Sequence, residues 1–249
     1  MDLAQFFQEN PRCALAFSGG VDSAYLLYAA MSHGARVRAY YVRTPFQPAF
    51  EFEDAQRMAL ALDADMKVIS LNVLEDERVT ANPANRCYYC KQKIFTAIRE
   101  AAAADGFSVL LDGTNASDDA SDRPGMRALR ELEVRSPLRE AGLTKHEIRR
   151  LSKEAGLFTH DKPAYACLAT RIPTGTKITA QNLRRTELAE AYLMQLGFSD
   201  FRIRLLGDAA RLQLRPEQLP RLLEHRQAIV AELKKYYSSV LLDLEVRNG

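Results

Sequence analysis

The chain has 249 residues, of which 47% are hydrophobic and 27% charged, with 34 Lys and Arg against 32 Asp and Glu. This is the composition of a globular protein, and the near balance of charge argues against one that coats nucleic acid or a membrane surface. The first residues include acids and no cationic start, and no stretch reaches the roughly 18 apolar residues of a membrane span. We therefore expect a cytoplasmic protein whose four cysteines are reduced: Cys13, Cys87, Cys90 and Cys167.

Short apolar runs alternate with helical patterns through the first two thirds of the chain. Strands are predicted at 11–17, 37–42, 66–71 and 109–111, helices at 24–34, 51–62, 90–104 and 144–155, and a short extended segment at 134–138. This alternation predicts an α/β fold with a doubly wound parallel sheet. Ligands in such sheets lie beyond the carboxyl ends of the strands, where residues 18–23 and 112–119 fall.

The pattern changes near Lys162 and Pro163. Beyond a loop, helices are predicted at 180–196 and 216–236, and strands at 201–206, 210–214 and 240–244. We expect two domains, residues 1–165 and a smaller α+β domain of residues 166–249. The net positive charge of the chain lies in the second, which suits a substrate that carries phosphate.

The segment Ser18-Gly19-Gly20-Val21-Asp22-Ser23 joins the first predicted strand to the first predicted helix. Its glycines allow phosphates to approach the backbone, and its N–H groups and the helix N-terminus attract anions. No G-x-x-x-x-G-K-[ST] motif is present, so this is not a Walker-type loop. The alternative is an ordinary capped turn.

The same six residues resemble the signature of the PP-loop ATP pyrophosphatases. The resemblance implies Mg²⁺-dependent use of ATP, with AMP transferred to a substrate and pyrophosphate released. It assigns the phosphates to Ser18, Gly19, Gly20, Asp22 and Ser23. The later segment Asp112-Gly113-Thr114-Asn115 resembles the loop that borders the nucleotide, and Gly113 is its candidate residue. The helix predicted at 144–155 has Thr144 as its N-cap and Glu147 at the capping-box position. Lys145, at the start of this helix, could reach the α-phosphate or simply be solvated.

Cys87 and Cys90 are separated by two residues, so both can face one site at a helix start. This spacing suits zinc, an iron–sulfur cluster or a redox pair. Zinc usually takes four ligands, and no second pair of ligands is evident. Together with Cys167, the pair could hold three irons of a [4Fe–4S] cluster and leave the fourth open. The alternative is a reversible disulfide with Cys167 as a lone thiol, while Cys13 is expected in the core.

Three segments carry a wider resemblance, to the LarE family: residues 82–91, 112–116 and 166–173. That family makes the nickel-pincer nucleotide cofactor by adenylating a pyridinium carboxylate mononucleotide and replacing the activated oxygen with sulfur. In some members, which lack the C-x-x-C, the cysteine that matches Cys167 gives up its own sulfur and becomes dehydroalanine. Others carry three cysteines and are thought to use a [4Fe–4S] cluster. This chain matches the second kind, so Cys167 is the candidate for both catalysis and cluster binding.

Four further residues are candidates for substrate binding. Arg202 and Arg204 alternate on a predicted strand and match the family's phosphate-binding arginines, and Glu190 matches an acidic residue near its sulfur site. Arg171 follows Cys167 closely. Each could instead be an ordinary surface residue.

The expected partners are a mononucleotide and sulfide or another sulfur donor, with no membrane; the oligomeric state is open, a homo-oligomer being one alternative. The main rival function is thiolation of tRNA, but no strong basic stripe or RNA-binding module is evident. A nucleotide-binding protein without catalysis is the other alternative, and conversion of ATP to AMP would exclude it.

Overall fold

The computed structural model describes residues 2–118 and 124–245. It divides into two compact units. The first, the sheet unit, comprises Met1–Val73 and Asn85–Lys162, and the second, the C-terminal unit, comprises Leu74–Ala84 and Pro163–Gly249. Among the described residues, no helix combines the length and the hydropathy needed to cross a bilayer.

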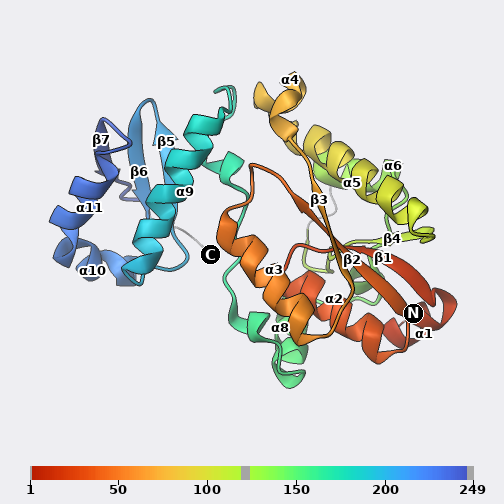
Figure 1. Ribbon diagram of the computed structural model, residues 1–249. Coiled ribbons are helices and arrows are strands. Elements are labelled where there is room, and N and C mark those ends of the chain that lie inside the picture. Colours follow the sequence, from red (N-terminus) through yellow and green to blue (C-terminus); the bar gives the residue numbers. More distant parts are fainter. Residues whose placement is uncertain (1, 119–123, 246–249) are drawn as a thin grey trace. The chain divides into compact units, whose positions relative to one another are not determined.

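The sheet unit contains four parallel strands in the order β3-β2-β1-β4 (Figure 1). Their bounds are β1 (Arg12–Ala16), β2 (Arg36–Arg43), β3 (Met66–Ser70) and β4 (Val109–Leu111). Leu15 of β1 pairs with Ala39 on one side and with Leu111 on the other. The chain order reverses at β1, so β1 and β4 leave the sheet beside each other at its carboxyl edge, where ligands of such sheets bind.

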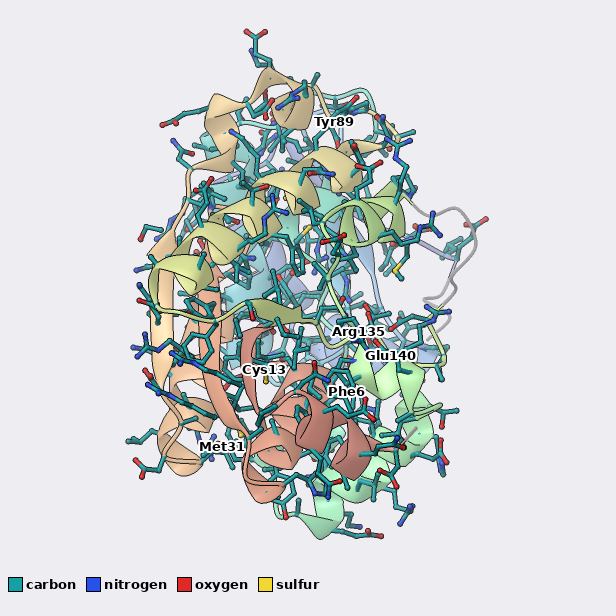
Figure 2. The ribbon with its side chains drawn as sticks, turned by 90° about the vertical axis from the view of Figure 1, so that its right-hand side faces the viewer. Phe6, Cys13, Met31, Tyr89, Arg135 and Glu140 are labelled. Carbon is teal, nitrogen blue, oxygen red and sulfur yellow. The ribbon has the colours of Figure 1, made fainter. Side chains whose placement is uncertain are left out.

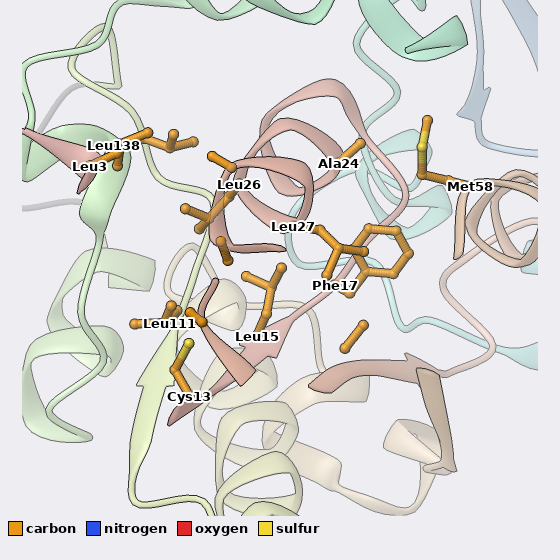
Figure 3. Close-up of a cluster of buried hydrophobic side chains, with 14 of the residues drawn as sticks. Leu3, Cys13, Leu15, Phe17, Ala24, Leu26, Leu27, Met58, Leu111 and Leu138 are labelled. Carbon is orange, nitrogen blue, oxygen red and sulfur yellow. The ribbon is translucent and has the colours of Figure 1, made fainter. Parts of the chain in front are cut away.

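Helices cover both faces of this sheet, which confirms the predicted doubly wound fold. They are α1 (Leu3–Glu9), α2 (Val21–Ser32), α3 (Ala49–Ala61), α5 (Arg86–Ala104), α6 (Pro124–Glu131), α7 (Pro137–Glu140) and α8 (Lys145–Glu154). Leu15 packs in the larger core cluster with Leu27 of α2 and Leu138 of α7 (Figure 3). Its neighbour Ala14 faces the other way and packs in a second cluster with Ile98 of α5. Alternate residues of a strand therefore serve the two cores.

Two predicted elements of the sheet unit differ from the structure. Residues 134–138 form only an isolated bridge, between Leu111 and Arg135, before α7 begins. The guanidinium of Arg135 pairs with Glu140, its Nε lying 2.9 Å from Oε1, and it also lies 5.0 Å from the ring centroid of Phe6 (Figure 2). Helix α5 begins at Arg86, four residues before the predicted start. The short helix α1 was not predicted.

The C-terminal unit contains a mixed sheet in the order β5-β6-β7. Its elements are α4 (Glu77–Thr80), α9 (Ala180–Gln195), β5 (Arg202–Leu206), β6 (Ala209–Gln213), α10 (Leu219–Glu224), α11 (Arg226–Leu233) and β7 (Ser239–Leu242). The single helix predicted at 216–236 is wrong, because the chain turns at His225 and separates α10 from α11. The segment 74–84 belongs here, since Asn82 donates to the carbonyl of Pro173 at 2.8 Å.

Candidate functional site

The predicted phosphate loop lies between β1 and α2, with its backbone held by its own serines. The amide of Ser18 donates to Oγ of Ser23 at 3.2 Å, and the two hydroxyls lie 3.1 Å apart. The hydroxyl of Ser23 donates in turn to the carbonyl of Gly20 at 3.2 Å. Gly20 is the N-cap of α2, so no side chain covers the N–H groups of the first turn. A bare helix N-terminus of this kind is a ready site for an anion.

Gly19 is the residue of the loop whose backbone requires glycine. Its φ is +71°, and a Cβ at this position would lie 2.9 Å from both Cα and Cβ of Ala55 on α3. The helix α3 therefore packs directly against the loop. A side chain at residue 19 would be strained and would also push α3 away.

The second predicted loop, which follows β4, meets the first. A Cβ on Gly113 would lie 3.1 Å from the amide nitrogen of Ser23 and 3.3 Å from Cβ of Asp22. Asp112 shapes the turn, because it accepts hydrogen bonds from the hydroxyls of Thr114 (2.5 Å) and Ser136 (2.6 Å). Asp119, which ends the predicted loop, lies outside the described residues.

Asp22 is the point where three segments converge. It lies in the first turn of α2, and its carboxylate accepts from Nδ2 of Asn115 at 3.2 Å and pairs with Nζ of Lys145 at 2.5 Å. Lys145 begins α8 behind the capping box of Thr144 and Glu147, which the sequence predicts and the structure confirms. The structure thus brings Lys145 to the phosphate loop rather than leaving it solvated. Its functional role stays a prediction.

The cysteines divide between the core and the surface, and all four are thiols. Cys13 is fully buried in β1, and burial raises its pKa to about 12, as expected of a core residue. Cys87 is exposed and Cys90 partly exposed on the first turns of α5, whereas Cys167 lies in the C-terminal unit. No group of three His, Cys, Asp or Glu side chains that could hold a metal ion is present among residues 2–118 and 124–245. The three-cysteine site stays a prediction.

Three arginines donate hydrogen bonds to backbone carbonyls of residues 164–171, here called the Cys167 segment. The guanidinium of Arg202 donates to the carbonyl of Ala164, that of Arg171 to the carbonyl of Ala166, and that of Arg204 to the carbonyl of Thr170, each at 2.8 Å. Arg202 and Arg204 reach the same segment, as expected of alternate positions on one strand. The structure brings all the predicted residues of the C-terminal unit together around Cys167.

Arg171 and Glu190 form a buried ion pair, each 1% exposed. Nε and Nη2 of Arg171 lie 2.9 and 3.0 Å from the two carboxylate oxygens of Glu190. Burial alone would lower the pKa of Arg171, but Glu190 raises it above its ordinary value. Tyr165, which the sequence analysis missed, donates to the same carboxylate at 2.5 Å, and burial raises the pKa of its hydroxyl. An aromatic residue two positions before a cysteine carries no distinctive signal in one sequence.

Known relatives match nearly the whole chain, although no family model does. The chain is 36% identical over 250 residues to an uncharacterized protein of Synechocystis, covering 98% of this chain and 92% of the relative. It is 32% identical over 245 residues to the pyridinium-3,5-bisthiocarboxylic acid mononucleotide synthase of Lactiplantibacillus plantarum, covering 97% and 89%.

A more distant match reaches the tRNA-specific 2-thiouridylase of Pseudothermotoga lettingae, at 25% identity over 187 residues, 61% of this chain and 54% of the relative. It agrees with a PP-loop fold, as the parallel sheet and the loop at its carboxyl edge also do. The chain belongs to the family of the pyridinium-3,5-bisthiocarboxylic acid mononucleotide synthase, LarE, whose members are ATP-dependent sulfur transferases of the PP-loop superfamily.

Proposed function

We propose that this protein adenylates the carboxylate of a pyridinium mononucleotide with ATP and then replaces the activated oxygen with sulfur, making a thiocarboxylate of the nickel-pincer nucleotide. The observation that carries the proposal is the pairing of two features in one chain. One is a phosphate loop that fits ATP, and the other is a cysteine segment held by arginines. The similarity to the synthase of L. plantarum supports the choice of substrate.

The phosphate loop would bind the β- and γ-phosphates of ATP. The N–H groups around Gly19 and Gly20 and the N-terminus of α2 are suited to phosphate oxygens, and Gly113 lets the second loop lie against the first. Mg²⁺ would offset the phosphate charge, and Asp22, in the first turn of α2, is the residue proposed to hold it. Lys145, now paired with Asp22, would then turn to the phosphates.

The chemistry needs two displacements. An oxygen of the substrate carboxylate attacks the α-phosphorus, the bond from that phosphorus to the bridging oxygen breaks, and pyrophosphate leaves. The product is a mixed anhydride, so its carbonyl carbon is open to attack by a sulfur nucleophile, with AMP as the leaving group. The cation of Lys145 can offset the negative charge that develops as pyrophosphate departs.

Cys87, Cys90 and Cys167 are the residues proposed to hold a [4Fe–4S] cluster. The three side chains fit this role in their chemistry, because thiolates are the usual ligands of such clusters and because all three are at least partly exposed, whereas Cys13 is buried. Cys87 and Cys90 also lie three residues apart at the start of one helix. When bound through three cysteines, a cluster keeps one iron open for a sulfide. The alternative is that Cys167 gives up its own sulfur.

The predicted substrate residues Arg202 and Arg204 remain candidates for the substrate phosphate, since guanidinium groups bind phosphate well. Both already donate to carbonyls of the Cys167 segment. Binding of the mononucleotide would therefore take place beside Cys167. Reduced thiols further suit a cytoplasmic enzyme. The sulfur donor and a homo-oligomer stay predictions.

A single anaerobic reaction tests the proposal. Protein reconstituted with iron and sulfide is incubated with ATP, Mg²⁺ and the pyridinium mononucleotide, and nucleotides, thiocarboxylate and intact protein mass are measured. We expect AMP and pyrophosphate, more than one thiocarboxylate per chain, and an unchanged protein mass. ADP and phosphate as the only products would refute adenylation.

The same experiment separates the two sulfur sources. Loss of the mass of one H₂S from Cys167, with turnover stopping at one, would restore the sacrificial mechanism. In Cys87→Ala and Cys90→Ala, we expect lower iron content and loss of repeated turnover, whereas Cys13→Ala should retain the iron. Unchanged iron in the first two variants would refute the cluster.

A further inference from the structure

Glu190, on α9, accepts hydrogen bonds from three residues of the C-terminal unit, two in the Cys167 segment and one on β5. Two come from the fork of Arg171, one from the hydroxyl of Tyr165, and one from the amide of Ile203 on β5, at 2.9 Å. Four donors saturate a carboxylate, whose oxygens offer about four lone-pair sites. Because it is 1% exposed and fully bonded, Glu190 is built into the unit rather than presented to a ligand.

The far side of Arg171 is tied to the backbone around Cys167. Nη1 donates to the carbonyl of Ala166 and to the hydroxyl oxygen of Thr170, each at 2.8 Å. The hydroxyl of Thr170 in turn donates to the carbonyl of Cys167 at 2.8 Å, so that Thr170 bridges Arg171 and Cys167. One guanidinium therefore fixes the residues before and after Cys167 to the carboxylate on α9.

Tyr165 closes the arrangement from the other side. Its ring centroid lies 4.6 Å from the guanidinium carbon of Arg171 and 5.3 Å from that of Arg202, so the ring packs with both cations. Its hydroxyl reaches Glu190, as described above. Tyr165 thus links the first part of the segment to the same carboxylate that anchors the second part.

The energetics favour a role in conformation rather than in stability. A buried ion pair gains little over well-packed apolar side chains, because desolvation of both charges offsets their attraction. The pair instead restricts conformation, because any rearrangement that separates the two side chains leaves a buried charge without a partner. In this unit the arrangement defined is that of the backbone on both sides of Cys167.

We propose that Tyr165, Arg171 and Glu190 form a positioning unit for the sulfur-transfer step, which holds residues 166–170 in the conformation that presents the Cys167 thiol. This inference rests on the proposed function, and it replaces the substrate-binding role predicted for Arg171 and Glu190. The unit acts after adenylation, because its contacts are made with the cysteine segment. Loss of one contact should slow sulfur transfer, which releases AMP, without slowing the adenylation step, which releases pyrophosphate.

Tyr165→Phe is the most selective test, because it removes one hydroxyl and keeps the ring. Tyr237→Phe is the matched control, at a residue of the C-terminal unit that lies outside the positioning unit. The hydroxyl of Tyr237 lies 3.3 Å from Oγ1 of Thr186 on α9, and its ring lies 4.8 Å from the guanidinium carbon of Arg185. The two substitutions are the same chemical change beside the same helix, but only Tyr165 belongs to the segment that carries Cys167.

Three quantities are measured for each variant: the rate of thiocarboxylate formation, the rate of pyrophosphate release in the first turnover, and deuterium uptake by the peptide that contains residues 166–170. For Tyr165→Phe we expect thiocarboxylate formation to fall about 10- to 100-fold, since small misplacements of reacting groups cost about that much. Pyrophosphate release in the first turnover should stay within about twofold, and uptake by this peptide should rise. Tyr237→Phe should change none of the three by more than about twofold.

Unchanged thiocarboxylate formation and unchanged deuterium uptake in Tyr165→Phe would overturn the proposal. An equal loss of both rates would overturn it too, because it would place Tyr165 at substrate binding. Deuterium uptake needs no substrate, so it tests the positioning unit even if the wild-type protein makes no thiocarboxylate and the proposed function fails. If Tyr165→Phe does not fold, uptake in Glu190→Gln takes its place, with unchanged uptake again as the refuting result.

Discussion

The phosphate loop and the Cys167 segment are both short connections between regular elements, but they are held by different means. The loop is fixed by backbone geometry, with Gly19 at φ +71° against Ala55 and two serines bonded to their own turn. The Cys167 segment is fixed by side chains, chiefly three guanidinium groups on its carbonyls. The loop is marked in the sequence by its own glycines, whereas two of the arginines that hold the Cys167 segment, Arg202 and Arg204, are 38 and 34 residues away from the carbonyls they contact.

The largest effect should come from Asp22, whose carboxylate joins the phosphate loop to two other segments of the sheet unit. Asp22→Ala removes the carboxylate that pairs with Lys145 and accepts from Asn115. We expect AMP formation to fall at least about 100-fold, because Lys145 and Mg²⁺, the cations proposed to stabilise charge on the reacting phosphates, would lose the carboxylate that positions them. The midpoint of thermal unfolding should change little, because Asp22 is partly exposed at the start of α2.

Asp22→Asn is the matched control for this prediction. It keeps the side-chain shape and an acceptor for Asn115 but loses the charge. We expect it to be nearly as inactive as Asp22→Ala, since the proposed role of Asp22 is to hold Lys145 and Mg²⁺ by its negative charge. Substantial activity in Asp22→Asn would mean that Asp22 only shapes the loop, and the contrast with the Cys167 segment would then weaken.

A smaller effect should come from the loop backbone itself. Gly19 and Gly34 both have positive φ, at +71° and +75°, but a Cβ on Gly34 would meet nothing within 4 Å. Gly34→Ala should therefore cost only the strain of the left-handed conformation, about 1 kcal/mol of unfolding free energy. Gly19→Ala should cost about 1–3 kcal/mol more because of the contact with α3.

The two alanine variants also separate stability from function. Gly19→Ala should raise the KM for ATP about tenfold or more, since the loop must shift where phosphates bind. Gly34→Ala should leave this KM unchanged. Urea unfolding and steady-state kinetics measure both. Equal KM values in the two variants would show that the loop tolerates displacement.

Most of the sheet unit could be predicted from the sequence, for reasons that the structure makes plain. The strands β1 to β4 are short apolar runs between helices with clear ends, and Thr144 and Glu147 form the predicted capping box. The phosphate loop was recognisable because its function resides in glycine and serine positions. The helix α1 was missed, since only Leu3, Phe6 and Phe7 mark its buried face.

The C-terminal unit was predicted less well, because its key contacts join residues far apart in the chain. Arg171 and Glu190 are 19 residues apart, and nothing near either one indicates that they form a buried pair. The segment 74–84 joins this unit through Asn82, which precedes its partners by 90 and 91 residues. The break at His225 was also hidden, because the residues on both sides of it favour helix.

The smallest predicted effect concerns Lys162, the last residue of the sheet unit. Its side chain, rather than its backbone, attaches this end of the unit to α3. Its Nζ lies 3.1 Å from a carboxylate oxygen of Glu51 and 2.7 Å from one of Asp54, both on α3, which is close enough for ion pairing. Lys162→Met keeps the apolar stem and leaves a partly buried Glu51 without its cation. We expect unfolding free energy at pH 8 to fall by about 1–3 kcal/mol.

This deficit should depend on pH, and its sign follows from Glu51. Burial raises the pKa of Glu51 even with Lys162 present, and Lys162 counteracts that rise. Without Lys162 the folded-state pKa is higher still, so ionisation opposes folding as the pH rises through that value. The deficit should therefore be smaller at pH 5, where Glu51 can take up a proton, than at pH 8.

The control is Lys153→Met, at an exposed site on α8, whose unfolding free energy should stay within about 0.5 kcal/mol of the wild-type value at both pH values. An equal deficit of Lys162→Met at the two pH values would show that Lys162 acts by packing alone, and that charge does not fix the end of the sheet unit.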